Sequence, residues 1–233
     1  MKNSEIKIEA IEFAIDGVAV LGPLSANFIE KRISIIGRNG SGKSTLARLM
    51  SGLITPTRGQ VHINDIDIAK DRKAALKTVG ILFQNPDHQI IFPTVGEEIA
   101  FGLRQLGYSK SDVEDKLRAI LEQFAKQDWY NRNVMTFSQG QRQLICLMSV
   151  LAMEPKVLIL DEPFSGLDIP TTRALSEILD NLDQTIIHIT HDPAVATNAD
   201  RVIWIDEGLI VKDGHPSDVL APFMAAMEQV NVL

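Results

Sequence analysis

The segment Gly37-Arg38-Asn39-Gly40-Ser41-Gly42-Lys43-Ser44, followed by Thr45, has the residue types and spacing of a phosphate-binding loop. Its glycines let the backbone bend so that successive N–H groups point at phosphate oxygens, and a following helix N-terminus adds partial positive charge. In this interpretation Lys43 contacts the β- and γ-phosphates of a nucleoside triphosphate, and the Ser44 hydroxyl binds Mg²⁺. The structural alternative is an ordinary glycine-rich turn. The apolar run 33–36 just before the loop predicts a buried strand, which favours the phosphate site.

Two carboxylates, Asp161 and Glu162, follow the apolar run 157–160. Neighbouring residues on a strand point to opposite sides, so the two acids can have separate roles. We expect Asp161 to support the Mg²⁺ shell and Glu162 to act as general base on the attacking water. An apolar strand that ends in acids is common on its own. The phosphate-binding loop far upstream is what favours the catalytic interpretation.

A third motif, Phe137-Ser138-Gln139-Gly140-Gln141, opens an apolar helix shortly before the acidic strand. Ser138 and Gln141 fit a capping box, S-x-x-Q, which is a purely structural explanation. A capped helix N-terminus is also an anion site. The order along the chain is phosphate loop, Gln84, Ser-x-Gly-Gln, Asp-Glu, the segment 165–168 and His191. This order resembles the ABC ATPase family over essentially the full length of the chain.

The resemblance implies that Ser138 and Gly140, with Gln141, bind the γ-phosphate of ATP held by a second subunit. The family usually has Leu-Ser-Gly-Gly-Gln here, and this chain has Phe137 and Gln139 in place of the Leu and the first Gly. Because the proposed contact residues are kept, we expect the site to be competent.

The resemblance also gives roles to three further residues. Gln84 contacts Mg²⁺ and senses the transmembrane partner, Asp168 communicates across the dimer, and His191 polarises the γ-phosphate and the water. The remaining histidines match no motif, and we interpret them as structural; they are His62, His88, His188 and His215. We also interpret the single cysteine, Cys146, as structural.

The residue that stacks on adenine in this family is usually aromatic, and its place falls at Ile15. Isoleucine can pack on adenine but lacks a π-face. Phe13, two residues earlier on the same strand face, could contribute. The sequence therefore leaves strict preference for ATP over GTP open.

The stretch from Asn85 to Val95, with the helix that begins near Glu97, resembles the ATPases of energy-coupling factor transporters. These import vitamins and transition-metal ions in prokaryotes. The resemblance implies a groove for coupling helices of a transmembrane subunit, and Ile90, Ile91 and Phe92 are candidates for its surface. Alternatively they fill the core of the helical region. Biotin, cobalt and nickel are the natural candidate solutes, with biotin favoured.

The periodicity predicts strands and helices in an α/β order. Alternation over 6–36 indicates several short strands, with turns at 16–17 and 22–23, and a helix follows over 45–53. Strands are expected at 61–63, 79–83, 157–160, 185–189 and 202–205, helices over 94–152, and a helix at 171–182. The expected fold is a P-loop NTPase (RecA-like) of the ABC ATPase type: a mostly parallel sheet, an N-terminal antiparallel β subdomain and an inserted α-helical subdomain. We expect one domain, with residues 1–85 and 156–233 as catalytic core and 86–155 as helical subdomain.

Composition narrows the class of protein. The net charge is −7 and no dense basic run occurs, which argues against nucleic acid as a partner. Neither a signal peptide nor an apolar run of membrane-spanning length is apparent. The resemblance implies a peripheral protein on the cytoplasmic face of a prokaryotic membrane, with ATP and Mg²⁺ as cofactors. Its implied partners are a second ATPase subunit (identical or a paralogue), a transmembrane coupling subunit and a substrate-binding membrane subunit.

Other functions fit less well. A soluble ABC ATPase, such as an iron–sulfur cluster assembly factor, or the ATPase of another importer or exporter, is the main alternative. An interaction protein with an inactive nucleotide site is disfavoured because every expected catalytic position holds a competent residue. A nucleoside kinase is disfavoured because no acceptor-binding lid is apparent.

Overall fold

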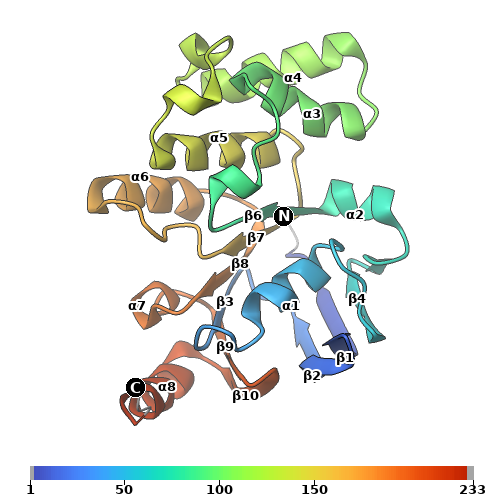
Figure 1. The fold of residues 1–233 in the computed structure, drawn as a ribbon, viewed down its shortest axis with the longest axis vertical. Helices are drawn as coiled ribbons and strands as arrows, with labels where there is room; N and C mark the ends of the chain where they lie inside the picture. The colour runs from blue at the N-terminus through green and yellow to red at the C-terminus, as the bar shows by residue number, and fades with distance from the viewer. Residues whose placement is uncertain (1–2, 230–233) are drawn as a thin grey trace.

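A six-stranded sheet forms the centre of the computed structural model, which describes residues 3–229 (Figure 1). Its strand order is β10-β9-β3-β8-β7-β6, and all neighbours are parallel except β9 and β10. The carboxyl ends of the parallel strands therefore lie at one edge, where loops can gather functional side chains. The strands are β3 (Arg32–Ile36), β6 (Val79–Leu82), β7 (Val157–Asp161), β8 (Thr185–Thr190), β9 (Arg201–Asp206) and β10 (Leu209–Gly214).

A second sheet of four antiparallel strands packs beside the first, in the order β2-β1-β4-β5. These are β1 (Ile6–Ile15), β2 (Val18–Phe28), β4 (Arg58–Ile63) and β5 (Ile66–Asp67). The predicted turn at Asp16-Gly17 joins β1 to β2. The turn predicted at Gly22-Pro23 is wrong, because both residues lie inside β2 with a cis bond between them. Gly22 is needed there since a Cβ at this position would collide with the carbonyl oxygen of Ile11 on β1.

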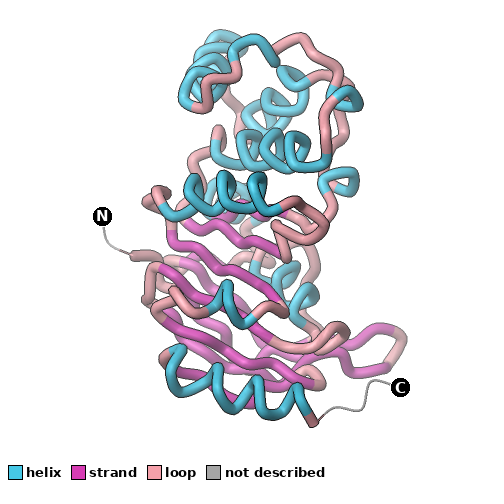
Figure 2. The backbone as a smooth tube through the Cα atoms, turned by 90° about the vertical axis from the view of Figure 1, so that its left-hand side faces the viewer, coloured by secondary structure: helices cyan, strands magenta, loops and turns pink. Residues whose placement is uncertain are grey.

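Helices cover both faces of the central sheet (Figures 1 and 2). Helix α1 (Lys43–Met50) lies between the two sheets, and α6 (Ile169–Asp180), α7 (Pro193–Ala196) and α8 (Pro216–Glu228) lie on the opposite face. Helix α2 (Arg72–Thr78) leads into β6. A group of helices stands at the β6 end of the sheet. It comprises α3 (Val95–Gln105), α4 (Lys110–Gln123), α5 (Gln139–Leu151) and the 3₁₀ turns η1 (Pro86–His88), η2 (Gln127–Trp129) and η3 (Val134–Thr136).

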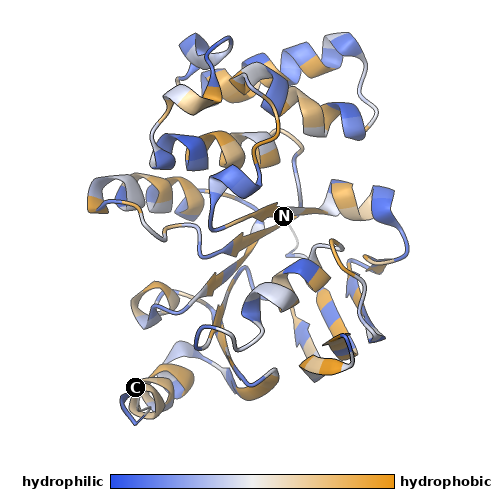
Figure 3. Ribbon diagram, in the orientation of Figure 1, coloured by the Kyte–Doolittle hydropathy of each residue, from blue (hydrophilic) through white to orange (hydrophobic). Residues whose placement is uncertain are grey.

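The core follows from strand alternation. In β7, Val157 and Ile159 pack toward α1 and the antiparallel sheet, whereas Leu158 and Leu160 pack toward α5 and α6. All four side chains are completely buried. The central strands accordingly appear mostly in the hydrophobic colour, while the helices around them alternate between hydrophobic and hydrophilic segments (Figure 3). This packing fixes the strand ends on which the candidate site is built.

Several predicted bounds were wrong by a few residues. Helix α1 begins at Lys43 rather than 45 and ends at Met50 rather than 53. Helix α6 covers 169–180 instead of 171–182, because Asp168 accepts a hydrogen bond from the Thr171 N–H and caps the helix earlier. The several short strands expected over 6–36 are two long strands, β1 and β2, and the shorter β3. The helices α2, α7 and α8 and the strands β5 and β10 were not predicted.

Within residues 3–229, no helix has the length and apolar character that crossing a membrane requires.

Candidate functional site

The loop 37–42 joins β3 to α1 and forms one wall of a cavity of about 520 Å³. Gly40 and Gly42 have φ of 81° and 100°, a left-handed conformation that costs a glycine little. Gly42 is the N-cap of α1 and provides no side-chain cap, so no N-cap side chain competes for the first N–H groups of the helix. The local sequence therefore makes an anion-binding helix start.

The ammonium group of Lys43 lies across this loop. Its Nζ donates hydrogen bonds of 2.8 Å to the carbonyl oxygens of Gly37 and Arg38. The residue is only 5% exposed, and burial lowers the pKa of its ammonium group, against the opposing attraction of Glu162 and Asp161. An ammonium group has three N–H donors, so one remains for a ligand in the cavity.

The two acids at the end of β7 occupy different environments. Asp161 ends the strand, and its Oδ1 accepts a 3.0 Å hydrogen bond from the Ser44 hydroxyl. Burial raises the pKa of the Asp161 carboxyl, and the Ser44 hydrogen bond partly opposes that rise. Glu162 turns away because its φ is +49°, and its backbone N–H donates to the Ile189 carbonyl of β8. The separation of the two carboxylates thus comes from a left-handed turn rather than from simple strand alternation.

Glu162 and His191 meet across the ends of β7 and β8. The Oε2 atom of Glu162 lies 2.8 Å from Nδ1 of His191, and the carboxylate is mostly buried while the imidazole is exposed. The Nε2 atom of His191 makes no hydrogen bond with any residue in the described range. The pair therefore presents a carboxylate and a free ring nitrogen to the same cavity.

Gln84, just after β6, reaches the cavity from its other side. Its amide Nε2 donates a 3.1 Å hydrogen bond to the hydroxyl of Ser165. Ser165 and Val20 also line the cavity, and sequence reasoning had given neither a role. Ser165 could have been found, because it belongs to the quoted segment 165–168. Val20 has no sequence signal beyond its place in a predicted strand region.

The structure brings together most of the predicted site. The predicted residues that line the cavity are Asn39, Gly40, Gly42, Lys43, Ser44, Thr45, Gln84, Glu162 and His191. Asp161 lines an adjoining cavity of about 270 Å³, together with Arg48 and His88. The Arg38 side chain instead forms a bidentate ion pair with Asp206 at the end of β9. Gly37 and Ser41 support the loop, since a Cβ on Gly37 would collide with the Ile205 carbonyl.

Ser138, Gly140, Gln141 and Asp168 do not line the cavity of their own chain. Ser138 caps α5 in a reciprocal capping box with Gln141, so the structural explanation of this pattern holds. Asp168 caps α6, and its hydrogen bond from Thr171 lowers the pKa of its carboxyl. These residues are free of the cavity and near the surface, where a second molecule could meet them.

The residues expected to contact the adenine ring or a transmembrane partner differ in how far they are buried. Ile15 is 54% exposed at the tip of the β1–β2 hairpin, whereas Phe13 packs partly into the core. Ile90 also packs against the core, and Phe92 lies against Phe101 with ring centroids 5.2 Å apart. Ile91 is 68% exposed. The core interpretation thus fits Ile90, and the surface interpretation fits Ile91.

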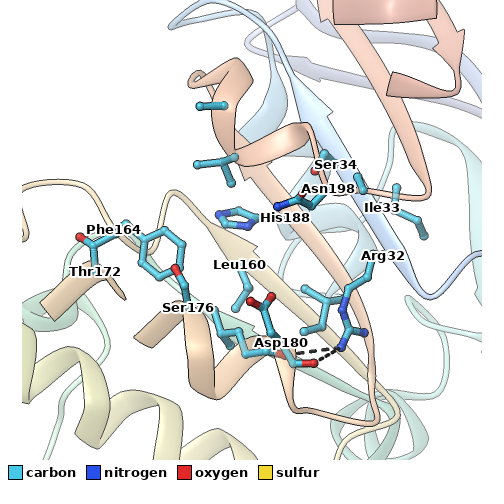
Figure 4. Close-up of a pocket in the computed structure, with 15 residues that line it drawn as sticks. Arg32, Ile33, Ser34, Leu160, Phe164, Thr172, Ser176, Asp180, His188 and Asn198 are labelled. Atoms are coloured by element: carbon cyan, nitrogen blue, oxygen red, sulfur yellow. Dashed lines mark hydrogen bonds between the residues drawn. The ribbon is translucent and has the colours of Figure 1, made fainter. Parts of the chain in front are cut away.

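A separate cavity of about 230 Å³ lies on the α6–α7 face of the sheet (Figure 4). His188 points into it with its ring in a T-shaped arrangement to that of Phe164, the two centroids 5.3 Å apart, and burial lowers the pKa of the imidazole to about 4. Arg32 at its rim donates hydrogen bonds of 2.7 and 2.8 Å to the carbonyls of Leu182 and Gln184. None of the predicted site residues lines this cavity.

Comparison with known proteins gives a consistent picture. A protein-family model described as "ABC transporter" matches residues 28–165. The biotin transport ATP-binding protein BioM of Rhodobacter capsulatus is 48% identical over 223 residues, covering 96% of this chain and 95% of that protein. The energy-coupling factor transporter ATP-binding protein EcfA of Methanocaldococcus jannaschii is 39% identical, covering 88% of this chain and 77% of that protein. The solved structure of cbiO1 from Clostridium perfringens, described as part of the ABC transporter complex cbiONQ, has a TM-score of 0.78 at 29% identity, covering 96% of this chain and 93% of that one.

Proposed function

The chain belongs to the ABC transporter family of ATP-binding proteins, and from this premise we propose that it is the ATP-hydrolysing subunit of an energy-coupling factor importer. The proposed solute is a micronutrient, with biotin favoured over cobalt or nickel ions. The observation that carries the proposal is the 48% identity to a biotin transport ATP-binding protein over nearly the whole of both chains. The cavity in which Lys43, Glu162 and His191 converge supports the chemistry.

In the proposed reaction, ATP binds with its phosphates against the loop 37–45. The loop carbonyls hold Lys43 on two of its three donors, which directs the third toward the β- and γ-phosphates. Glu162 accepts a proton from the attacking water, whose oxygen bonds to the γ-phosphorus as the bond to the β,γ-bridging oxygen breaks and ADP leaves. His191, oriented through its Nδ1, contacts the γ-phosphate with Nε2. Ser138 and Gly140 of a second subunit close over the phosphate, because a capped helix start favours an anion.

The donor set around Ser44 fits Mg²⁺. A hydroxyl and a carboxylate oxygen face each other at 3.0 Å, and hard oxygen donors are the ligands this ion prefers. Ser44 and Asp161, with Gln84 nearby, would hold the ion, and the ion would neutralise charge on the phosphates.

We propose that the protein docks on the cytoplasmic face of a membrane through the region around Gln84 and Val95. Ile91, seven residues after Gln84 in the chain, supplies an exposed apolar contact, and Gln84 reports the docked state to the cavity through Ser165. The proposed partners are a second ATPase subunit, a transmembrane coupling subunit and a substrate-binding membrane subunit. In this assembly residues 86–155 act as the helical subdomain, and 1–85 with 156–233 act as the catalytic core.

The test is to isolate the tagged chain from solubilised membranes of the organism that produces it and to identify the proteins that co-purify with it. We expect integral membrane proteins, and uptake of radiolabelled biotin that stops when Lys43→Ala replaces the wild-type chain. Uptake of labelled cobalt or nickel ions is the control that separates the solutes. Recovery without membrane proteins would refute the transport function and favour a soluble ABC ATPase.

A further inference from the structure

The start of helix α5 is held by one peptide group, the amide between Phe137 and Ser138. Its carbonyl oxygen accepts a 2.7 Å hydrogen bond from Nη1 of Arg142. Its N–H donates a 3.0 Å hydrogen bond to Oε1 of Gln141. Both polar atoms of this peptide group are therefore fixed by side chains of the first helical turn, so the orientation of Ser138 depends on where Arg142 is held.

Arg142 is in turn held by the segment that follows Gln84. Its Nε lies 2.9 Å from Oδ1 of Asp87 in η1, an ion pair whose N–H is not aligned for a hydrogen bond. The Arg142 side chain is 19% exposed and the Asp87 side chain 52%, so solvent reaches the pair from the carboxylate side. One guanidinium group thus contacts both the segment after Gln84 and the peptide group that carries Ser138.

Further contacts join α5 firmly to residues 83–87, the segment around and after Gln84. Gln143 is 1% exposed and donates a 3.0 Å hydrogen bond from Nε2 to the carbonyl of Phe83. Cys146 lies against the Pro86 carbonyl, with Sγ 3.9 Å from the oxygen. Positions 142, 143 and 146 share one face of a helix, and that face points at residues 83–87. A displacement of the segment would therefore move α5 with it.

We propose that Arg142 is a positioning residue that transmits the position of Asp87 to Ser138, and so sets how the start of α5 meets the nucleotide of a second subunit. This inference rests on the proposed function, because it takes Ser138 as a phosphate contact. It adds a defined connection between the docking region and that contact. Asp87 acts through Arg142 and lines neither the nucleotide cavity nor the adjoining one.

The experiment measures ATP-dependent dimerisation of the full chain in a Glu162→Gln background, by light scattering over a range of ATP concentrations. Asp87→Ala, Arg142→Ala, Arg142→Lys and the double variant Asp87→Ala with Arg142→Ala are compared. The matched control is Lys116→Ala, which removes an ion pair of 2.8 Å with Glu154 in the same helical region. Binding of a fluorescent ATP analogue to the monomer reports the cavity separately.

We expect Arg142→Ala to raise the ATP concentration for half-maximal dimerisation about tenfold, since a hydrogen bond from a charged donor is lost. Asp87→Ala raises this ATP concentration less than Arg142→Ala does. Arg142→Lys gives a value between those of the parent and Arg142→Ala, because lysine keeps the charge but cannot bridge both acceptors. The double variant matches Arg142→Ala, because Asp87 acts only through Arg142. Analogue binding and the control variant stay at the parent values.

Additive effects of Asp87→Ala and Arg142→Ala would overturn the inference, as would an Asp87→Ala variant that behaves like the control. An equal loss of analogue binding by the monomer would also overturn it, since the role would then be general folding. Asp87→Ala and Arg142→Lys keep the test decisive if Arg142→Ala does not fold. If the Glu162→Gln parent itself forms no ATP-dependent dimer, the proposed function fails instead.

Discussion

Replacement of Glu162 by glutamine separates nucleotide binding from hydrolysis. Glutamine has nearly the same shape, and the backbone N–H of residue 162 keeps its 3.0 Å hydrogen bond to Ile189. The new amide can still donate to Nδ1 of His191, which lies 2.8 Å from the replaced oxygen. What disappears is the only proton acceptor that this position offers to a water molecule in the cavity.

The expected loss follows from that role. A positioned general base contributes about 10²- to 10⁴-fold to a rate, or roughly 3 to 5 kcal/mol of activation free energy. Because Glu162 and His191 are in direct contact, their contributions are not additive. We therefore expect Glu162→Gln with His191→Ala to be about as slow as the slower single variant.

The assay is phosphate release at saturating ATP and Mg²⁺, together with equilibrium binding of ATP and light scattering for dimer formation. Hydrolysis falls by the factor above, while ATP binding stays within about twofold and the ATP-bound dimer accumulates. Glu177→Gln, at an exposed position on α6, is the control for loss of a carboxylate. Phosphate release by Glu162→Gln at more than about a tenth of the wild-type rate would refute the general-base role.

Four further outcomes test separate parts of the structure. Lys43→Ala should weaken ATP binding at least about tenfold in equilibrium dialysis, because a charged phosphate contact is lost; unchanged affinity would remove Lys43 from the site. His188 has a pKa lowered to about 4 against an ordinary 6.5, so its stabilising contribution is complete above pH 6.5 and is lost as pH falls toward 4. Urea unfolding should show up to about 3 kcal/mol of this pH dependence, and His188→Gln should lack it. Gly140→Ala should lower stability by about 1–3 kcal/mol in urea unfolding, since its Cβ collides with the γ-methyl of Thr171, and Thr171→Ser should restore part of the loss. The Cys146 thiol is buried and its pKa is raised, so a thiol reagent should react with it only after unfolding; rapid modification of the folded chain would contradict this burial.

The nucleotide site was largely predictable from local sequence. The glycines, Lys43 and Ser44 act through a loop and a helix start that are continuous in the chain, so their spacing reports their geometry. The acids after β7 were equally visible, because a buried strand must be apolar until it ends. Ser138 and Gln141 were visible for a similar reason, since a capping box needs only four residues.

Tertiary structure decided what those residues contact. The meeting of Glu162 with His191, of Ser44 with Asp161 and of Gln84 with Ser165 depends on the order of β6, β7, β8 and β3 in the sheet. No local pattern encodes that order.

The turn wrongly expected at Gly22-Pro23 shows the same limit. Glycine and proline usually punctuate a chain, yet here packing against β1 keeps one long strand through them. Arg142 is a second example, since its place after the capping box says nothing of Asp87. The chain by itself determined which chemistry is possible, because motif geometry is local. The fold alone determined which side chains share a cavity, because that depends on contacts between residues far apart in sequence.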